Sequence, residues 1–371
     1  MQAKKITGEK VKYAVVGVGW ISQTAFLPGV EHTGNSEVVA LVTSHAEKAE
    51  KVGEKYGIDR VYSYEEFNQV LAMDDIEAVY LATPNFDHLD LAVKTLRAGV
   101  HLLLEKPMAV SVEECEQILS AREETGAKLM IAYRLHHEPG TLSAIESARN
   151  GEIGRVRFFN SSFTQMVSGQ NHRAKNGFWA GPVADMGPYP INAVRNLFGA
   201  EPIEVSAIGV QTDERFDFED TVTVNLKFPA ERVASFVVSY NAADVDEFRI
   251  IGEKGDLYSH PAYGMNGSIH HTITVEGKTK ERDFPATDHF GGELKYFSEC
   301  LKNGRNPEAD GEEGLLDVRV IEAIEKSLRT GETILLKPYD RKKRPAMAQK
   351  VELKQNSTPE LVGAHKPSDG Q

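Results

Sequence analysis

The first third of the chain alternates between short apolar runs and stretches with apolar residues at helical spacing. The apolar runs have the length and continuity of strands buried on both faces of a sheet. We expect five such strands, at Val11–Gly17, Val38–Thr43, Ala78–Thr83, Val100–Leu104 and Leu129–Tyr133. Between them, Ala46–Tyr56 reads as a charged helix and His88–Ala98 as an amphipathic helix. This alternation predicts βαβ units, and therefore a doubly wound parallel sheet.

After about residue 139 the pattern changes to alternating apolar and polar positions. Such alternation is typical of antiparallel strands with one covered face. We expect strands at Arg155–Gln165, Glu204–Gln211, Thr221–Phe228, Val233–Tyr240, Glu247–Ile251 and Ile269–Val275, and a late helix at Gly314–Arg329. The fold class is therefore α/β, with a C-terminal α+β domain. We expect domains at residues 1–135 and 136–338, and a polar tail at 339–371 that is either flexible or an arm around a partner subunit.

Composition narrows the class of partner. The chain has 42 Lys and Arg against 55 Asp and Glu, a net charge of −13, which argues against nucleic-acid binding. No apolar run approaches the ~18 residues that a membrane span needs. The polar start does not read as a secretory signal, so we expect a cytoplasmic protein, or a periplasmic one if a leader has been removed. Cys115 and Cys300 lack metal-ligand spacing, and no metal is expected.

A glycine-rich turn directly follows the first expected strand. It reads Gly17-Val18-Gly19-Trp20-Ile21-Ser22 and opens a helix. In a dinucleotide site the first glycine makes the tight turn and the second lets the backbone approach the pyrophosphate. The third glycine of the usual motif is Ser22 here. We therefore expect cofactor binding at Gly17, Gly19, Trp20 and Ile21; the alternative is a packing turn.

The end of the second strand indicates which dinucleotide binds. An NAD site normally places an acidic residue there to bind the ribose 2′-hydroxyl. This chain has Thr43 and Ser44, followed by Lys48. Two hydroxyls and a lysine suit a 2′-phosphate, so the sequence predicts NADP. The alternative is that Lys48 is a solvated helix residue.

Two further motifs carry groups that could move a proton. Lys106, in Glu105-Lys106-Pro107, follows the fourth strand and so belongs at the carboxyl edge of the sheet, where ligands bind. Asp185 and Tyr189 would share one helix face if the turn between them is helical. An ammonium such as that of Lys106 would favour the phenolate of Tyr189. The alternative is an N-cap aspartate and a core tyrosine.

In this order, the glycine turn, Thr83-Pro84-Asn85-Phe86-Asp87-His88, Glu105-Lys106-Pro107 and Asp185-x-x-x-Tyr189 resemble the Gfo/Idh/MocA oxidoreductase family. The likeness runs from about Lys12 to Leu336 and is strongest to the branch of glucose–fructose and aldose–aldose oxidoreductases. It implies a Rossmann domain followed by a domain with a large open sheet, through which a homo-oligomer (a dimer or tetramer) would form.

The resemblance also implies roles for individual residues. It places the catalytic lysine on Lys106 and the Asp-x-x-x-Tyr pair on Asp185 and Tyr189. It extends the cofactor site to Thr83, Pro84, Asn85, His88, Glu105, Lys106 and Arg134. It gives Arg134, His172 and Trp179 as further candidates for the sugar pocket, although loop or packing roles fit His172 and Trp179 equally well. The loop 166–179 and the run 180–184 depart from the family pattern, which leaves the substrate open.

The expected function is oxidation of a cyclic aldose at C1 to a lactone, with tightly bound NADP recycled by reducing a second sugar. Tyr189, helped by Lys106, would accept the hydroxyl proton, and Asp185 would position the sugar or Lys106. One alternative is a plain NADP-dependent sugar dehydrogenase, acting at C1 or C3, that releases NADPH. The other is a nucleotide-sensing regulator without catalysis.

Overall fold

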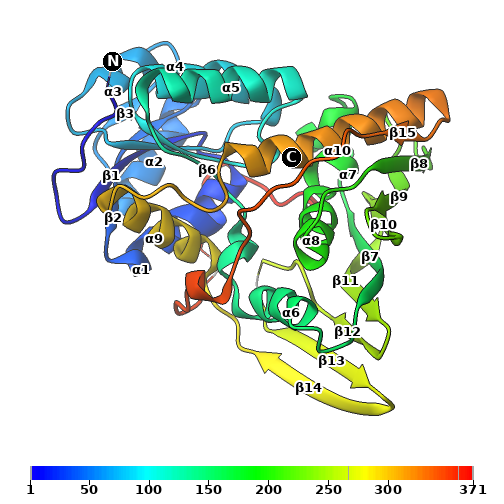
Figure 1. The fold of residues 1–371 in the computed structure, drawn as a ribbon. Helices are drawn as coiled ribbons and strands as arrows, with labels where there is room; N and C mark the ends of the chain where they lie inside the picture. The colour runs from blue at the N-terminus through cyan, green and yellow to red at the C-terminus, as the bar shows by residue number, and fades with distance from the viewer. Residues whose placement is uncertain (1, 266, 358, 370–371) are drawn as a thin grey trace. The chain divides into compact units, whose positions relative to one another are not determined.

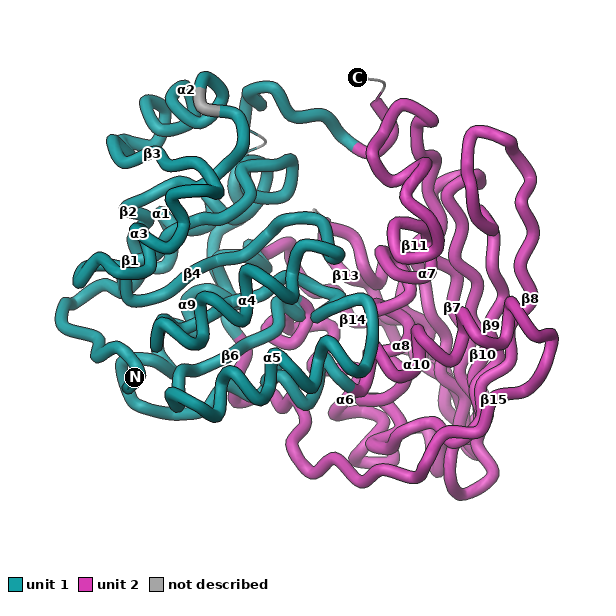
Figure 2. Tube along the Cα trace, turned by 90° about the horizontal axis from the view of Figure 1, so that it is seen from above, with its two compact units in different colours: residues 1–134, 288–315, 351–366 teal, residues 135–287, 316–350, 367–371 magenta. Residues whose placement is uncertain are grey.

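The computed structural model describes residues 2–265, 267–357 and 359–369 (Figure 1). The chain divides into two compact units (Figure 2). Unit 1 comprises residues 1–134, 288–315 and 351–366, and unit 2 comprises residues 135–287, 316–350 and 367–371. The units thus interleave along the chain, whereas the sequence analysis expected three consecutive segments.

Unit 1 is built on a parallel sheet, as predicted. Within the described residues its strand order is β3-β2-β1-β4-β5-β6, with every pairing parallel. The strands are β1 Val11–Val16, β2 Ser36–Val42, β3 Val61–Tyr62, β4 Ala78–Leu81, β5 His101–Leu104 and β6 Leu129–Ile131. The sequence analysis missed β3, because two half-buried residues are too short to show a period.

Helices connect these strands, and their caps follow the sequence. The helical elements are η1 Ser22–Phe26 (one π-helical turn), α1 Leu27–Thr33, α2 Ala46–Tyr56, α3 Phe67–Ala72, η2 Asn85–Asp87, α4 His88–Arg97, α5 Val112–Thr125 and α9 His289–Lys302. Helix α5 begins at a capping box, in which the Ser111 hydroxyl accepts from the Glu114 amide at 3.1 Å. It ends at Gly126, which has a left-handed conformation.

Unit 2 contains a larger, mostly antiparallel sheet. In the described part of the chain its order is β14-β13-β12-β11-β7-β10-β9-β8-β15, and β7 pairs in parallel with β10. The strands are β7 Val156–Met166, β8 Glu204–Val210, β9 Thr221–Phe228, β10 Arg232–Ser239, β11 Asn241–Gly252, β12 Gly255–Ser259, β13 Ile269–Val275, β14 Lys278–Phe284 and β15 Ile334–Leu335. The sequence analysis missed β12, β14 and β15; β14 is polar and mostly exposed, so it shows no apolar alternation.

One face of this sheet is covered and the other is open. Along β9 the side chains of Val222, Val224 and Phe228 are buried in the core, while Thr223 and Asn225 are exposed. The core also takes side chains from helices α6 Pro139–Arg149, α8 Pro188–Phe198 and α10 Gly311–Thr330. This pattern is the one expected from period-two alternation in a half-covered sheet.

Among the residues that the structure describes, no helix is long and apolar enough to cross a membrane.

Candidate active site

The glycine turn lies in unit 1, between β1 and η1, and its geometry requires the first glycine. Gly17 has φ of +91°, and a methyl group there would lie 2.6 Å from the carbonyl oxygen of Ala82. A methyl group on Gly19 would meet no atom within 4 Å, so the space beside it is open. Ser22, at the usual position of the third glycine, donates its hydroxyl to the Gly17 carbonyl at 2.6 Å. The serine therefore ties the turn together.

Two buried polar atoms beside this turn fit a bound dinucleotide. Trp20 Nε1 and Thr83 Oγ1 are buried and have no hydrogen-bond partner among the described residues. Buried polar groups normally find partners, so orphaned ones beside an open turn suit a polar ligand. Ile21 caps η1, and Asn85 opens η2 directly after Pro84. These elements would hold NADP, with the pyrophosphate against the turn.

The end of β2 carries the three residues that we expect at a 2′-phosphate. Thr43 is buried and its hydroxyl accepts from the His45 amide at 3.4 Å, while Ser44 is exposed. Lys48, in the first turn of α2, is half-buried, and burial lowers its pKa. The amine and the two hydroxyls follow the strand end in sequence, and no acidic residue stands between Val42 and Ala46.

Lys106 directly follows Glu105, which is anchored after the end of β5. Glu105 accepts from the Tyr80 hydroxyl at 2.7 Å and from the Lys106 amide at 3.3 Å. Lys106 is half-buried, and its peptide bond to Pro107 is cis. The carboxylate thus fixes the backbone from which the lysine projects.

His88 joins two of the expected cofactor loops. Its Nδ1 lies 3.0 Å from the carbonyl oxygen of Pro107, and its Nε2 lies 3.1 Å from that of Thr83. Burial lowers its pKa to about 4, so the ring is neutral at ordinary pH. Both ring nitrogens face backbone carbonyls, and a neutral ring can donate to one of them, so His88 contacts both loops; its contact with the cofactor stays a prediction.

Arg134 leads to a buried residue that the sequence analysis missed. Its guanidinium lies 2.8 Å from His289 Nδ1 and 5.5 Å above the ring of Phe290. Glu293, one turn along α9, is fully buried, and neither carboxyl oxygen has a hydrogen-bond partner in the described part of the chain. Burial and the nearby Glu105 raise the pKa of Glu293 well above its usual range. The sequence gives one sign of it, a glutamate between Phe290 and Phe297 on one helix face.

Asp185 and Tyr189 lie in unit 2, on consecutive short helices. Helix α7 Pro182–Asp185 ends at the aspartate, and Tyr189 is the second residue of α8. Its ring is half-buried, with centroid distances of 5.2 Å to Phe163 and 5.9 Å to Tyr263. The aspartate is therefore not an N-cap of α8, and the tyrosine is not fully buried.

The carboxylate of Asp185 has two partners that the sequence analysis did not find. Arg173 Nε donates to Oδ2 at 3.0 Å, and the Tyr240 hydroxyl donates to the same oxygen at 2.9 Å. Burial, with the charge of Asp185 beside it, raises the pKa of Tyr240 well above its usual range, so this phenol remains a donor. Charge-assisted bonds of this kind favour the ionised carboxylate. No local pattern could reveal them, because Tyr240 is 55 residues away in the sequence.

The two remaining pocket candidates, His172 and Trp179, have different surroundings in the structure. His172 is exposed. The half-buried Trp179 packs its ring edge-on against Phe178 at 5.7 Å and hydrogen-bonds to Glu325. Trp179 therefore has the contacts of a packing residue.

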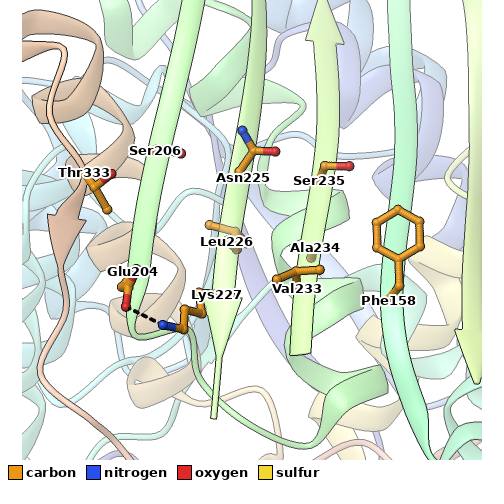
Figure 3. Close-up of a pocket in the computed structure, with 10 residues that line it drawn as sticks. All are labelled: Phe158, Glu204, Ser206, Asn225, Leu226, Lys227, Val233, Ala234, Ser235 and Thr333. Atoms are coloured by element: carbon orange, nitrogen blue, oxygen red, sulfur yellow. Dashed lines mark hydrogen bonds and ion pairs between the residues drawn. The ribbon is translucent and has the colours of Figure 1, made fainter. Parts of the chain in front are cut away.

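A hollow of about 400 Å³ lies on the open face of the unit 2 sheet, away from these candidates (Figure 3). Its lining includes Phe158, Asn225 and Val233, and at one side of it Lys227 and Glu204 form an ion pair of 3.0 Å. None of the expected catalytic or cofactor residues lines it. Its position suits an interface better than a catalytic centre.

Comparison with known proteins finds two relatives and one protein of similar fold. A D-xylose 1-dehydrogenase [NADP(+)] of Haloarcula marismortui is 32% identical over 90% of this chain and 96% of its own length. The crystal structure of an aldose–aldose oxidoreductase from Caulobacter crescentus is 34% identical, covers 88% of this chain and all of its own, and has a TM-score of 0.82. A 3-ketoreductase from Actinomadura kijaniata, solved with NADP, has a TM-score of 0.76 at 24% identity and shows the shared fold alone.

Two family models also match. Residues 11–133 match the model of an oxidoreductase family with an NAD-binding Rossmann fold, and residues 142–258 match the GFO/IDH/MocA C-terminal domain. The resemblance read from the motifs is confirmed, and the chain belongs to the Gfo/Idh/MocA oxidoreductase family.

Proposed function

We propose that this protein is an NADP-dependent sugar oxidoreductase that oxidises a cyclic aldose at C1 to a lactone. The observation that carries the proposal is the Asp185 carboxylate bound by Arg173 and Tyr240. An aspartate held in its ionised form leaves Tyr189 as the member of the pair that exchanges a proton. The xylose dehydrogenase and the aldose–aldose oxidoreductase, at 32% and 34% identity, are named as enzymes of aldoses, which supports the substrate class.

NADP is the cofactor of this proposal, and when bound it accepts the hydride from C1. The chain binds it through the glycine turn and through Thr43, Ser44 and Lys48. Tyr189 takes the proton from the C1 hydroxyl, so the sugar loses one hydride and one proton and becomes the lactone. Lys106 stabilises the negative charge that develops on the oxygen. Asp185 accepts hydrogen bonds from sugar hydroxyls and orients the ring.

The finer part of the proposal is that NADP stays bound and is reoxidised in place by a second sugar. Tyr189 then donates the proton that it accepted in the first half-reaction. Backbone amides of the glycine turn and the Lys48 amine bind the phosphates of NADP. The second candidate is a plain dehydrogenase that releases NADPH, which the name of the xylose-oxidising relative favours. A non-catalytic regulator would have no use for Lys106, Asp185 and Tyr189 together.

We also propose that the protein is a homo-oligomer, a dimer or tetramer, formed through the open face of the unit 2 sheet. Ile208, Val210 and Val233 expose 74%, 51% and 50% of their surface. Exposed apolar side chains on one open sheet face are typical of an interface, although Val233 lies at the other end of the face from Ile208 and Val210. A second copy of this chain is the occupant that the family resemblance implies.

The position of oxidation can be tested by product analysis. Protein supplied with an aldose and free NADP should give a lactone, or its hydrolysed aldonate, by NMR. A keto sugar oxidised at C3 would contradict the C1 assignment while leaving the enzyme class intact. Absence of any NADP-linked product from a panel of aldoses would contradict the proposed function itself.

A further inference from the structure

The C-terminal segment packs against the dinucleotide half of the molecule. We call residues 351–366, apart from the undescribed position 358, the strap; it belongs to unit 1 (Figure 2). Its first part is fixed at the start of α9. The carbonyl of Leu353 accepts from the Asp288 amide at 3.1 Å, and the Asn356 side chain donates to the Asp288 carboxylate at 2.9 Å. The strap thus has an anchor that is independent of the cofactor elements.

Its second part is bonded to the helix that follows the glycine turn. The Gln23 carboxamide pairs with the backbone of Val362 in both directions: it accepts from the amide at 2.8 Å and donates to the carbonyl at 3.0 Å. Gln23 is 2% exposed and also donates to the carbonyl of Val18, inside the glycine turn, at 3.2 Å. One buried side chain therefore joins the strap to the turn that would bind the pyrophosphate.

The same part of the strap touches α2, the helix after the expected 2′-phosphate site. Lys55 Nζ donates to the carbonyl of Glu360 at 2.6 Å. Gly363 faces the side chain of Lys48, because a methyl group at Gly363 would lie 3.6 Å from Cδ of that lysine. The strap therefore bridges the two elements that the proposed function assigns to the adenosine end of NADP.

We propose that the strap closes the adenosine side of the dinucleotide site and slows the release of NADP and NADPH. The inference rests on the proposed function for the identity of the ligand. Two hydrogen bonds join the buried Gln23 side chain to Val362, and a third joins it to Val18. A movement of the strap therefore also moves the side chain that is bonded to the glycine turn. The stem of Lys48 is packed against Gly363, which limits how its ammonium can move. A cofactor that is held on this side stays bound between two half-reactions without any contact to the sugar.

Two shortened chains test the strap directly. A chain that ends at Ser357 keeps the anchor on Asp288 and loses the contacts to Gln23, Lys48 and Lys55. The matched control ends at Lys366, keeps all of these contacts and loses only the last five residues. The readout is the rate of NADPH release, measured by fluorescence after mixing with excess NADP. We expect release from the Ser357 chain to be about tenfold faster, the scale of one to two lost buried hydrogen bonds, and the control to match the full chain.

Fragments of NADP show at which end of the cofactor the strap acts. The affinity for 2′,5′-ADP, which lacks the nicotinamide, should fall by a similar factor in the Ser357 chain, while that for nicotinamide mononucleotide stays unchanged. Val362→Pro, which removes the amide that donates to the Gln23 carboxamide and leaves the bond from Gln23 to the Val18 carbonyl in place, should also speed NADPH release. This variant decides the matter if the Ser357 chain does not fold.

Equal release rates from the full and Ser357 chains, or slower release from the shortened one, would overturn the inference while leaving the proposed function standing. A full-length protein that does not bind NADPH would overturn both.

Discussion

At the scale of single residues, Asp185 and Tyr189 have different surroundings in the candidate site. Asp185 is bound by Arg173 and Tyr240, whereas the half-buried Tyr189 lies against aromatic rings. Lys106 stands on a backbone fixed by the Glu105 carboxylate. In the proposed reaction, Asp185 orients the sugar, Tyr189 transfers the proton and Lys106 supplies positive charge.

The proton-transfer assignment predicts the effect of two variants. Tyr189→Phe and Lys106→Ala should each lower kcat by ~10²–10⁴-fold, the usual worth of a general acid–base group. Neither should change NADPH affinity by more than a few fold, which fluorescence titration checks. The double variant should lose little more than the worse single one, because the two groups act as a unit. Turnover at the native rate in Tyr189→Phe would show instead that the tyrosine only packs.

Arg173 is a positioning residue in this account, acting through Asp185. Their side chains are 22% and 26% exposed, so the ion pair is partly screened. Arg173→Met should lower kcat/KM near neutral pH by about tenfold. It should also move the acid limb of the pH profile to higher pH, because an aspartate without its cation takes up a proton more readily.

The charged and titratable groups around this carboxylate include Arg173, Tyr240 and His172, so the pH profile is informative. Arg173→Lys should restore part of the profile. Lys175→Met, an exposed change in the same loop, is the matched control and should leave it unchanged. A uniform loss of activity with an unmoved acid limb would mean that Arg173 only supports the fold of its loop.

At the scale of elements, the sequence predicts what is buried on both faces and misses what is exposed or very short. The apolar runs at β1, β2, β4, β5 and β6 reveal the parallel sheet because both faces of each strand are covered. Strand β14 reads KTKERDF and pairs only at the edge of its sheet, so neither hydropathy nor period marks it.

The sequence also locates the candidate site better than it explains the site's contacts. A glycine turn and an Asp-x-x-x-Tyr pair have local spacing, so they can be found along the chain. The partners Arg173, Tyr240 and Glu293 are recognised only by contacts or burial that arise when distant segments pack. The contact of the strap with Gln23 could not be predicted from the sequence either, because nothing in a polar tail indicates which side chain it will bond to.

At the scale of the whole molecule, the open sheet face predicts self-association. Ile208→Asp places a charge on the exposed face of β8 and should shift the sedimenting species toward the monomer, while Phe86→Asp, an equally drastic change on the other unit, should not. Equilibrium sedimentation measures both. A native protein that sediments as a monomer at micromolar concentration would contradict the proposed oligomer.

One experiment on the intact protein tests both half-reactions of the proposed reaction, the oxidation of one sugar and the reduction of another. The protein is purified with no added cofactor, mixed with an aldose alone, and its products and absorbance are followed. We expect the reduced-nicotinamide band to appear on the protein, and aldonate and alditol then to form in equal amounts without free NADP. Turnover only when free NADP is supplied, with NADPH accumulating in solution, would contradict the recycling reaction and establish a plain sugar dehydrogenase.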